Sequence, residues 1–147
     1  MNQVNQETAN IVCATRGGEG SKPTVQRAIS IARERGFRLT FLYIADLQFM
    51  KRTITGHARL AAEEMRKMGE FIMLTFVEKA QEQGVEADFA VRKARFRDGL
   101  LRYLEETRPA MLVLGSSKPG TAYLTASSLD KLVQEIEEQT GVLVELA

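Results

Sequence analysis

Two loops of this chain carry glycines and serines in patterns that suit the binding of an anion. The first is Gly115-Ser-Ser-Lys-Pro-Gly120, which follows a strongly apolar run and precedes Ser127 and Ser128. A glycine turn after a strand lets backbone N–H groups approach a phosphate, and a serine at the next helix start adds a hydroxyl and a favourable dipole. Glycine and serine are also common in surface loops. An anion site and an ordinary loop with a capping serine are therefore both open.

The second loop is Thr15-Arg16-Gly-Gly-Glu-Gly20-Ser21, which also joins an apolar run to a predicted helix. Its glycine spacing matches neither the P-loop nor the dinucleotide fingerprint. The glycines either bring a ligand close to the backbone or relieve a tight turn. We retain Thr15 and Arg16 as candidate ligand-binding residues.

A basic run, Arg92, Lys93, Arg95 and Arg97, follows the third predicted strand. Most charge runs are solvated surface. However, Arg16, this run and Lys118 all follow strands that point the same way, which places them on one edge of a parallel sheet. A local positive field would attract an anion there although the whole chain has a formal net charge of only +1.

Signals for catalysis are weak. His57 is the only histidine and stands at a predicted helix start, and Cys13 lies within an apolar strand where it packs without reacting. The chain shows no metal-ligand spacing and no nucleophile with a recognisable partner. We therefore expect no catalytic residue, no metal and no enzyme, with slow nucleotide hydrolysis as the remaining enzymatic alternative.

The elements that must position these residues alternate along the chain. Strands with apolar patterns are predicted at residues 10–15, 38–45, 85–91, 110–114 and 142–146. Helices are predicted at about 21–35, 58–83 and 96–107, and from Ser127 or Ser128 to 140. This alternation predicts a parallel α/β sheet with right-handed crossovers. A ligand crevice is expected at the carboxyl ends of the first and fourth strands, where the strand order reverses.

The long second helix carries an apolar pattern. Ala61, Met65, Met68, Ile72 and Phe76 are predicted to trace one face of it. The segment 71–77 is nearly all apolar, which predicts that this part is covered on more than one side.

The whole chain of 147 residues suits one domain, predicted over residues 9–147 after a polar tail at 1–8. The near-neutral charge argues against nucleic acid as a partner, and no apolar stretch reaches the ~18 residues of a membrane span. A single cysteine and the absence of a signal-peptide pattern at the start favour a soluble, cytoplasmic protein.

Taken in order, these segments resemble the universal stress protein family. The resemblance rests on Ile11–Thr15, Ala28–Ala32, Gly36–Ile44, Leu112–Ser116 and the last strand from Val142. It implies a three-layer α/β/α, Rossmann-like fold of the adenine nucleotide alpha hydrolase-like type, with strand order 3-2-1-4-5. It also implies a homodimer formed through residues 142–146. Because such domains occur attached to transporters and kinases, a larger protein or a transporter is a further expected partner.

Many members of the family bind ATP with a Gly, two residues, a Gly, nine residues, a Gly, then Ser or Thr. Here Gly115 matches the first glycine, but Lys118 and Ser128 stand at the positions of the other two. If this chain has one residue fewer than the motif between the second and third glycines, Ser127-Ser128 takes the place of the Gly-Ser pair. Arg16 replaces the family's acidic residue after the first strand. The resemblance therefore implies a non-enzymatic stress-response module without tight ATP binding. The alternative is a domain that binds ATP, AMP or another anionic ligand through Thr15, Arg16, Gly115, Lys118, Ser127 and Ser128.

Overall fold

The computed structural model describes residues 9–15, 21–45, 56–115 and 126–147, and for residues 56–62, 65 and 126–128 it describes the backbone alone. The predicted tail at 1–8 lies outside these ranges. The described strands form a five-stranded parallel sheet of order β3-β2-β1-β4-β5, as the resemblance implied. The strands are β1 (Asn10–Ala14), β2 (Arg38–Ala45), β3 (Ala87–Lys93), β4 (Met111–Leu114) and β5 (Leu143–Leu146).

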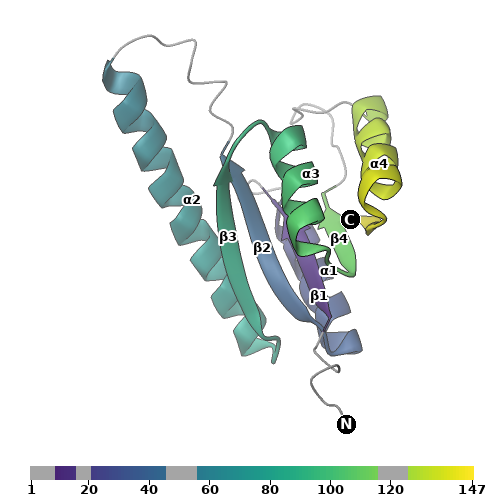
Figure 1. Ribbon diagram of the computed structural model, residues 1–147. Coiled ribbons are helices and arrows are strands. Elements are labelled where there is room, and N and C mark those ends of the chain that lie inside the picture. The colour runs from purple at the N-terminus through teal and green to yellow at the C-terminus, as the bar shows by residue number, and fades with distance from the viewer. Residues whose placement is uncertain (1–8, 16–20, 46–55, 116–125) are drawn as a thin grey trace.

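Helices cover both faces of this sheet, which gives the predicted three layers (Figure 1). Strands β2 and β3 are added on one side of β1, and β4 and β5 on the other. Because each βαβ crossover is right-handed, this change of side places two helices on one face of the sheet and two on the other. The first pair is α1 (Ser21–Arg35) and α2 (Gly56–Glu82), and the second is α3 (Phe96–Thr107) and α4 (Ala126–Thr140). None of the described helices is both long and apolar enough to cross a membrane.

The ends of the helices follow local backbone chemistry. The chain turns out of α1, α2 and α4 at Gly36, Gly84 and Gly141, which all have positive φ. Glycine adopts this left-handed conformation without steric cost. Helix α3 instead ends at Arg108, a non-glycine residue with φ 45°, whose N–H donates to the carbonyl of Leu104. Pro109 follows and cannot continue the helix.

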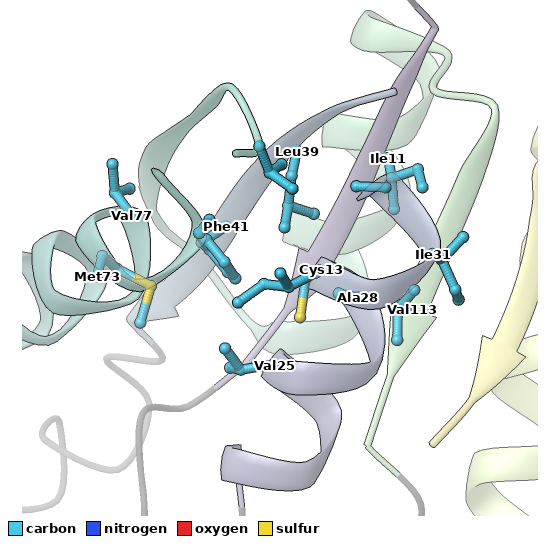
Figure 2. Packing of buried hydrophobic residues seen from close by; sticks show 14 of the residues in the cluster. Ile11, Cys13, Val25, Ala28, Ile31, Leu39, Phe41, Met73, Val77 and Val113 are labelled. Carbon is cyan, nitrogen blue, oxygen red and sulfur yellow. The ribbon is translucent and has the colours of Figure 1, made fainter. Parts of the chain in front are cut away.

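The core has one layer on each side of the central strands. Strand β1 is buried on both faces: Ile11 and Cys13 face α1 and α2, while Val12 and Ala14 face α3 and α4. Figure 2 shows side chains of β1, β2, α1 and α2 gathered in the first layer. Phe41 is fully buried there, with its ring centroid 5.6 Å from that of Phe76. This matches the continuous apolar runs that predicted strands covered on both sides.

Strand β3 differs from its predicted bounds of 85–91. It begins at Ala87 and runs to Lys93, because its pairing with β2 continues to the register pair Ala45–Lys93. Arg92 and Lys93 are therefore the last residues of an edge strand and not loop residues. Val85 precedes the strand and is buried nevertheless.

The predicted apolar face of α2 is buried only in part, because Ile72 and Phe76 pack against the core whereas the residue surface of Met68 is 62% exposed. The face against the sheet is formed by Gly69, Met73 and Ala80, which are all buried. Phe71 is 67% exposed, so the prediction that segment 71–77 is covered on more than one side is wrong. A 3.6-residue period fits the face that includes Met68 as well as the face that includes Met73. Only the packing of the helix on β2 and β3 decides which of these two faces is buried.

Candidate functional site

The carboxyl ends of β1 and β4 lie side by side at the middle of the sheet. Ala14 pairs in register with Leu114, and Thr15 and Gly115 follow directly. This is the point where the chain order reverses, with β2 on one side of β1 and β4 on the other. The structure thus brings two of the candidate residues together at the edge where open α/β sheets bind ligands.

Thr15 is buried, and both its backbone N–H and its side-chain hydroxyl form hydrogen bonds. Its N–H donates to the carbonyl of Leu42 at 3.1 Å, and its Oγ1 donates to Oγ of Ser21 at 2.6 Å. Ser21 is the first residue of α1, so this hydrogen bond ties the end of β1 to the start of the following helix. The hydroxyl groups of Thr15 and Ser21 are therefore engaged with each other.

Gly115 packs closely against α1. A Cβ atom at this position would lie 3.0 Å from Oγ1 of Thr24, a side chain that is almost fully buried. Glycine therefore has a structural role here, because it lets the end of β4 approach the first turn of α1. Sequence reasoning missed Thr24. Its spacing of three residues after Ser21 is the one signal that could have placed both hydroxyls near the same end of the helix.

Four candidate residues remain, namely Arg16, Lys118, Ser127 and Ser128. Arg16 and Lys118 lie outside the described residues. Helix α4 begins at Ala126, so Ser127 and Ser128 are its second and third residues and not the predicted capping residue. Alanine is the strongest helix former, which accounts for the earlier start.

The basic run separates into two groups. Arg97 extends to helix α4, where its Nε donates to Oε1 of Glu135 at 2.8 Å and its Nη2 contacts Oε2 of the same carboxylate. Hydrogen bonding to this carboxylate raises the pKa of Arg97, and the same hydrogen bond lowers the pKa of Glu135. Arg97 therefore does not belong to the expected positive edge. Arg92, Lys93 and Arg95 remain at the end of β3.

The described residues contain little that suits catalysis. Cys13 is fully buried, and this burial raises the pKa of its thiol to about 12, which keeps the thiol protonated and unreactive. His57 is the second residue of α2, as a helix-start residue would be. No group of three or more potential metal ligands occurs within the parts of the chain that the structure describes.

The sequence model of the universal stress protein family matches residues 7–138 of this chain. The chain belongs to the universal stress protein family. A search of curated proteins gives no significant match.

Solved structures of universal stress proteins share the fold. A protein of the family from Burkholderia pseudomallei is 17% identical, with 96% of each chain covered and a TM-score of 0.75. A universal stress protein in complex with cAMP is 18% identical, with 96% of this chain and 97% of that chain covered and a TM-score of 0.68. A family protein from Arabidopsis thaliana with AMP bound is 16% identical, with 94% and 90% covered and a TM-score of 0.59. Similarity at this level shows the shared fold.

Proposed function

We propose that this universal stress protein, with its domain over residues 9–147, is a non-enzymatic regulatory module of the stress response that acts as a homodimer without tight ATP binding. The observation that carries the proposal is the loss of two of the three glycines of the nucleotide motif. Only Gly115 remains, and it is packed against Thr24. The cytoplasm, where a lone thiol stays reduced, is the compartment that we expect.

The replaced residues disfavour a triphosphate for a physical reason. Side chains at Lys118 and at Ser127 or Ser128 add Cβ atoms where the family pattern has none, and these atoms crowd a phosphate chain that lies against the backbone. Arg16 stands in place of an acid, which removes an acceptor for a sugar hydroxyl.

The free edge of β5 supports the homodimer. The strand pairs with β4 on one side, where the N–H of Ala147 donates to the carbonyl of Leu114 at 2.8 Å. Leu143 is 62% exposed and Leu146 is 40% exposed. An apolar edge strand is a ready template for pairing with another chain, and a second copy would cover both leucines. A larger protein or a transporter is the partner that such a dimer would regulate.

Native mass spectrometry of the purified protein tests the proposal in one measurement. We expect the mass of two chains with no nucleotide retained. A monomer at micromolar concentration would contradict the dimer. A dimer that retains ATP would contradict the claim about tight binding.

A second candidate function is the binding of an adenine nucleotide, such as AMP or ATP, or of another anion. It is supported by the relatives that were solved with cAMP and with AMP. The hydroxyl group of Thr24 beside Gly115 and that of Ser21 beside Thr15 add hydrogen-bonding capacity near the carboxyl ends of β1 and β4. In a thermal-shift assay with AMP and cAMP, any stabilisation should weaken in Arg16→Ala and Lys118→Ala. No shift at millimolar nucleotide would exclude this function.

A further inference from the structure

A pocket of about 280 Å³ lies between the end of β3 and helix α3, and its lining runs from Arg92 to Glu106. We call it the α3 pocket. Four cationic side chains line it: Arg92, Lys93, Arg95 and Arg102.

The α3 pocket is separate from the candidate nucleotide site. All of its lining residues lie between positions 92 and 106, in β3, α3 and the turn between them. Strand β3 is at the edge of the sheet, and β2 stands between it and β1. Neither Thr15 nor Gly115 lines this pocket.

Two contacts shape the pocket. The guanidinium carbon of Arg92 lies 5.0 Å from the ring centroid of Tyr103, and Nη1 of Arg92 donates to the carbonyl of Val91 at 3.1 Å. The ring thus supports the guanidinium from one side. Gly99 lets α3 approach closely, since a Cβ at this position would lie only 2.9 Å from Cβ of Ala94.

The charges of the lining are unbalanced. Two carboxylates, Asp98 and Glu106, face the four cations, so the lining carries +4 and −2, or +2 in total. Asp98 is moreover engaged with Arg97, whose Nη1 lies 3.0 Å from its Oδ1. Within the described ranges, none of the four lining cations forms an ion pair.

Two further acids lie near this site, Asp88 of β3, whose charge acts on the lining residue Tyr103, and Glu63 of α2. Glu63 has a lowered pKa, mainly through its hydrogen bond to Arg66 and to a smaller extent through the charge of Lys93. Arg66 binds both Glu63 and Glu70, so it offsets the charge of Glu63 only in part, and the excess of two positive charges belongs to the lining residues themselves.

We propose that the α3 pocket binds the phosphate group of a small ligand. A phosphate monoester carries close to two negative charges at neutral pH, which matches the excess of two positive charges. Arginine presents a planar fork that binds phosphate oxygens in pairs, and three of the four cations are arginines. The volume suits a small molecule, and the net charge of +1 for the whole chain provides no extended field for a nucleic acid.

Titration with inorganic phosphate, followed by two-dimensional amide NMR at low ionic strength, tests this proposal. We expect saturable shifts at Ala94 and Gly99. The test variant is Arg95→Gln with Arg102→Gln, because both side chains are exposed and form no ion pair within the described residues. Loss of two charge-assisted contacts should weaken phosphate binding at least about tenfold.

The matched control is Arg33→Gln with Arg35→Gln, which removes the same charge from exposed positions at the end of α1. This control should bind phosphate as the wild type does. Equal weakening in both variants, or shifts that grow linearly like those caused by sodium chloride, would overturn the proposal. Equally strong binding of succinate, which has the same charge, would overturn the assignment to phosphate.

Titration with AMP separates the α3 pocket from the nucleotide site. If AMP shifts Gly115 and Thr24 and its binding survives in Arg95→Gln with Arg102→Gln, the two sites are independent. If inorganic phosphate itself shifts Gly115 and Thr24 and leaves Gly99 unchanged, the proposal is wrong. Failure of AMP to shift Gly115 and Thr24, with inorganic phosphate still shifting Gly99, would count against the nucleotide-binding candidate alone.

Discussion

Gly69 of α2 is the residue on which the approach of this helix to the sheet depends. A Cβ atom at Gly69 would lie 2.3 Å from Cε2 of Tyr43, whose ring is held at the end of β2 with only 9% of the residue exposed. No real side chain tolerates such a distance, so the ring or the helix must move. The glycine is there for packing, and sequence alone does not reveal this because the two residues are far apart in the chain.

Gly69→Ala should therefore destabilise the protein. Overpacking typically costs about 1–3 kcal/mol and exceeds the gain of about 1 kcal/mol in helix propensity. Urea denaturation followed by circular dichroism measures the free energy of unfolding. The control is the same change in a Tyr43→Leu background, where the smaller side chain leaves room and Gly69→Ala should become neutral or stabilising. An equal cost in both backgrounds would contradict the contact.

Cys13 gives the protein a definite response to high pH. Burial raises the pKa of its thiol from 9.0 to about 12 in the folded state. The neutral thiol therefore contributes stability that is complete below pH 9 and is lost as the pH rises towards 12. The full effect corresponds to roughly 4 kcal/mol.

The comparison of wild type with Cys13→Ala isolates this effect, because all other groups that titrate are shared. The difference in free energy of unfolding between them should be constant below pH 9. Above pH 9 the wild type should lose free energy of unfolding relative to Cys13→Ala. A difference that stays constant from pH 8 to about pH 11 would contradict the raised pKa.

At the scale of elements, the large apolar side chains that are exposed among the described residues lie in two places. One is the outer stripe of α2, with Met68, Phe71 and Leu74, and the other is the edge of β5. A helix stripe has its backbone hydrogen bonds satisfied within the helix, whereas an edge strand also leaves backbone groups unpaired. We therefore propose β5 as the interface, because pairing there would cover apolar side chains and also satisfy backbone groups.

Charge placed on β5 should break the dimer. Leu143→Lys with Leu146→Lys puts two like charges from each chain at the proposed interface, and light scattering should then give the mass of one chain. Leu74→Lys, at a site that is 48% exposed on α2, is the matched control and should stay dimeric. A dimer that survives the β5 changes and is lost with Leu74→Lys would move the interface to α2.

The elements themselves were largely predictable from periodicity. The apolar runs at 10–15 and 38–45 predicted β1 and β2 closely because strands buried on both faces leave a strong signal. The errors concern surfaces that depend on neighbours. Met68 fits the helical period as well as Met73 does, and the end of β3 is set by its pairing with Ala45.

At the scale of the whole molecule, the alternation of strands and helices predicted the parallel α/β architecture. The order of the strands came from the family resemblance, since periodicity does not determine it. The site was harder to predict. Gly115 and Thr15 follow strands and were found from sequence, whereas Thr24 and the α3 pocket depend on how separate elements approach one another.

The central claim is that loss of the glycine motif has removed tight ATP binding. Calorimetric titration of the wild-type protein with ATP tests it, beside a variant that restores glycines, Lys118→Gly with Ser127→Gly. We expect the wild type to show no saturable heat below about 1 mM ATP, which corresponds to a binding free energy weaker than about −4 kcal/mol. We expect the variant to bind ATP more tightly than the wild type does. Saturable binding of ATP to the wild type with a dissociation constant near 1 μM, about −8 kcal/mol, would contradict the account.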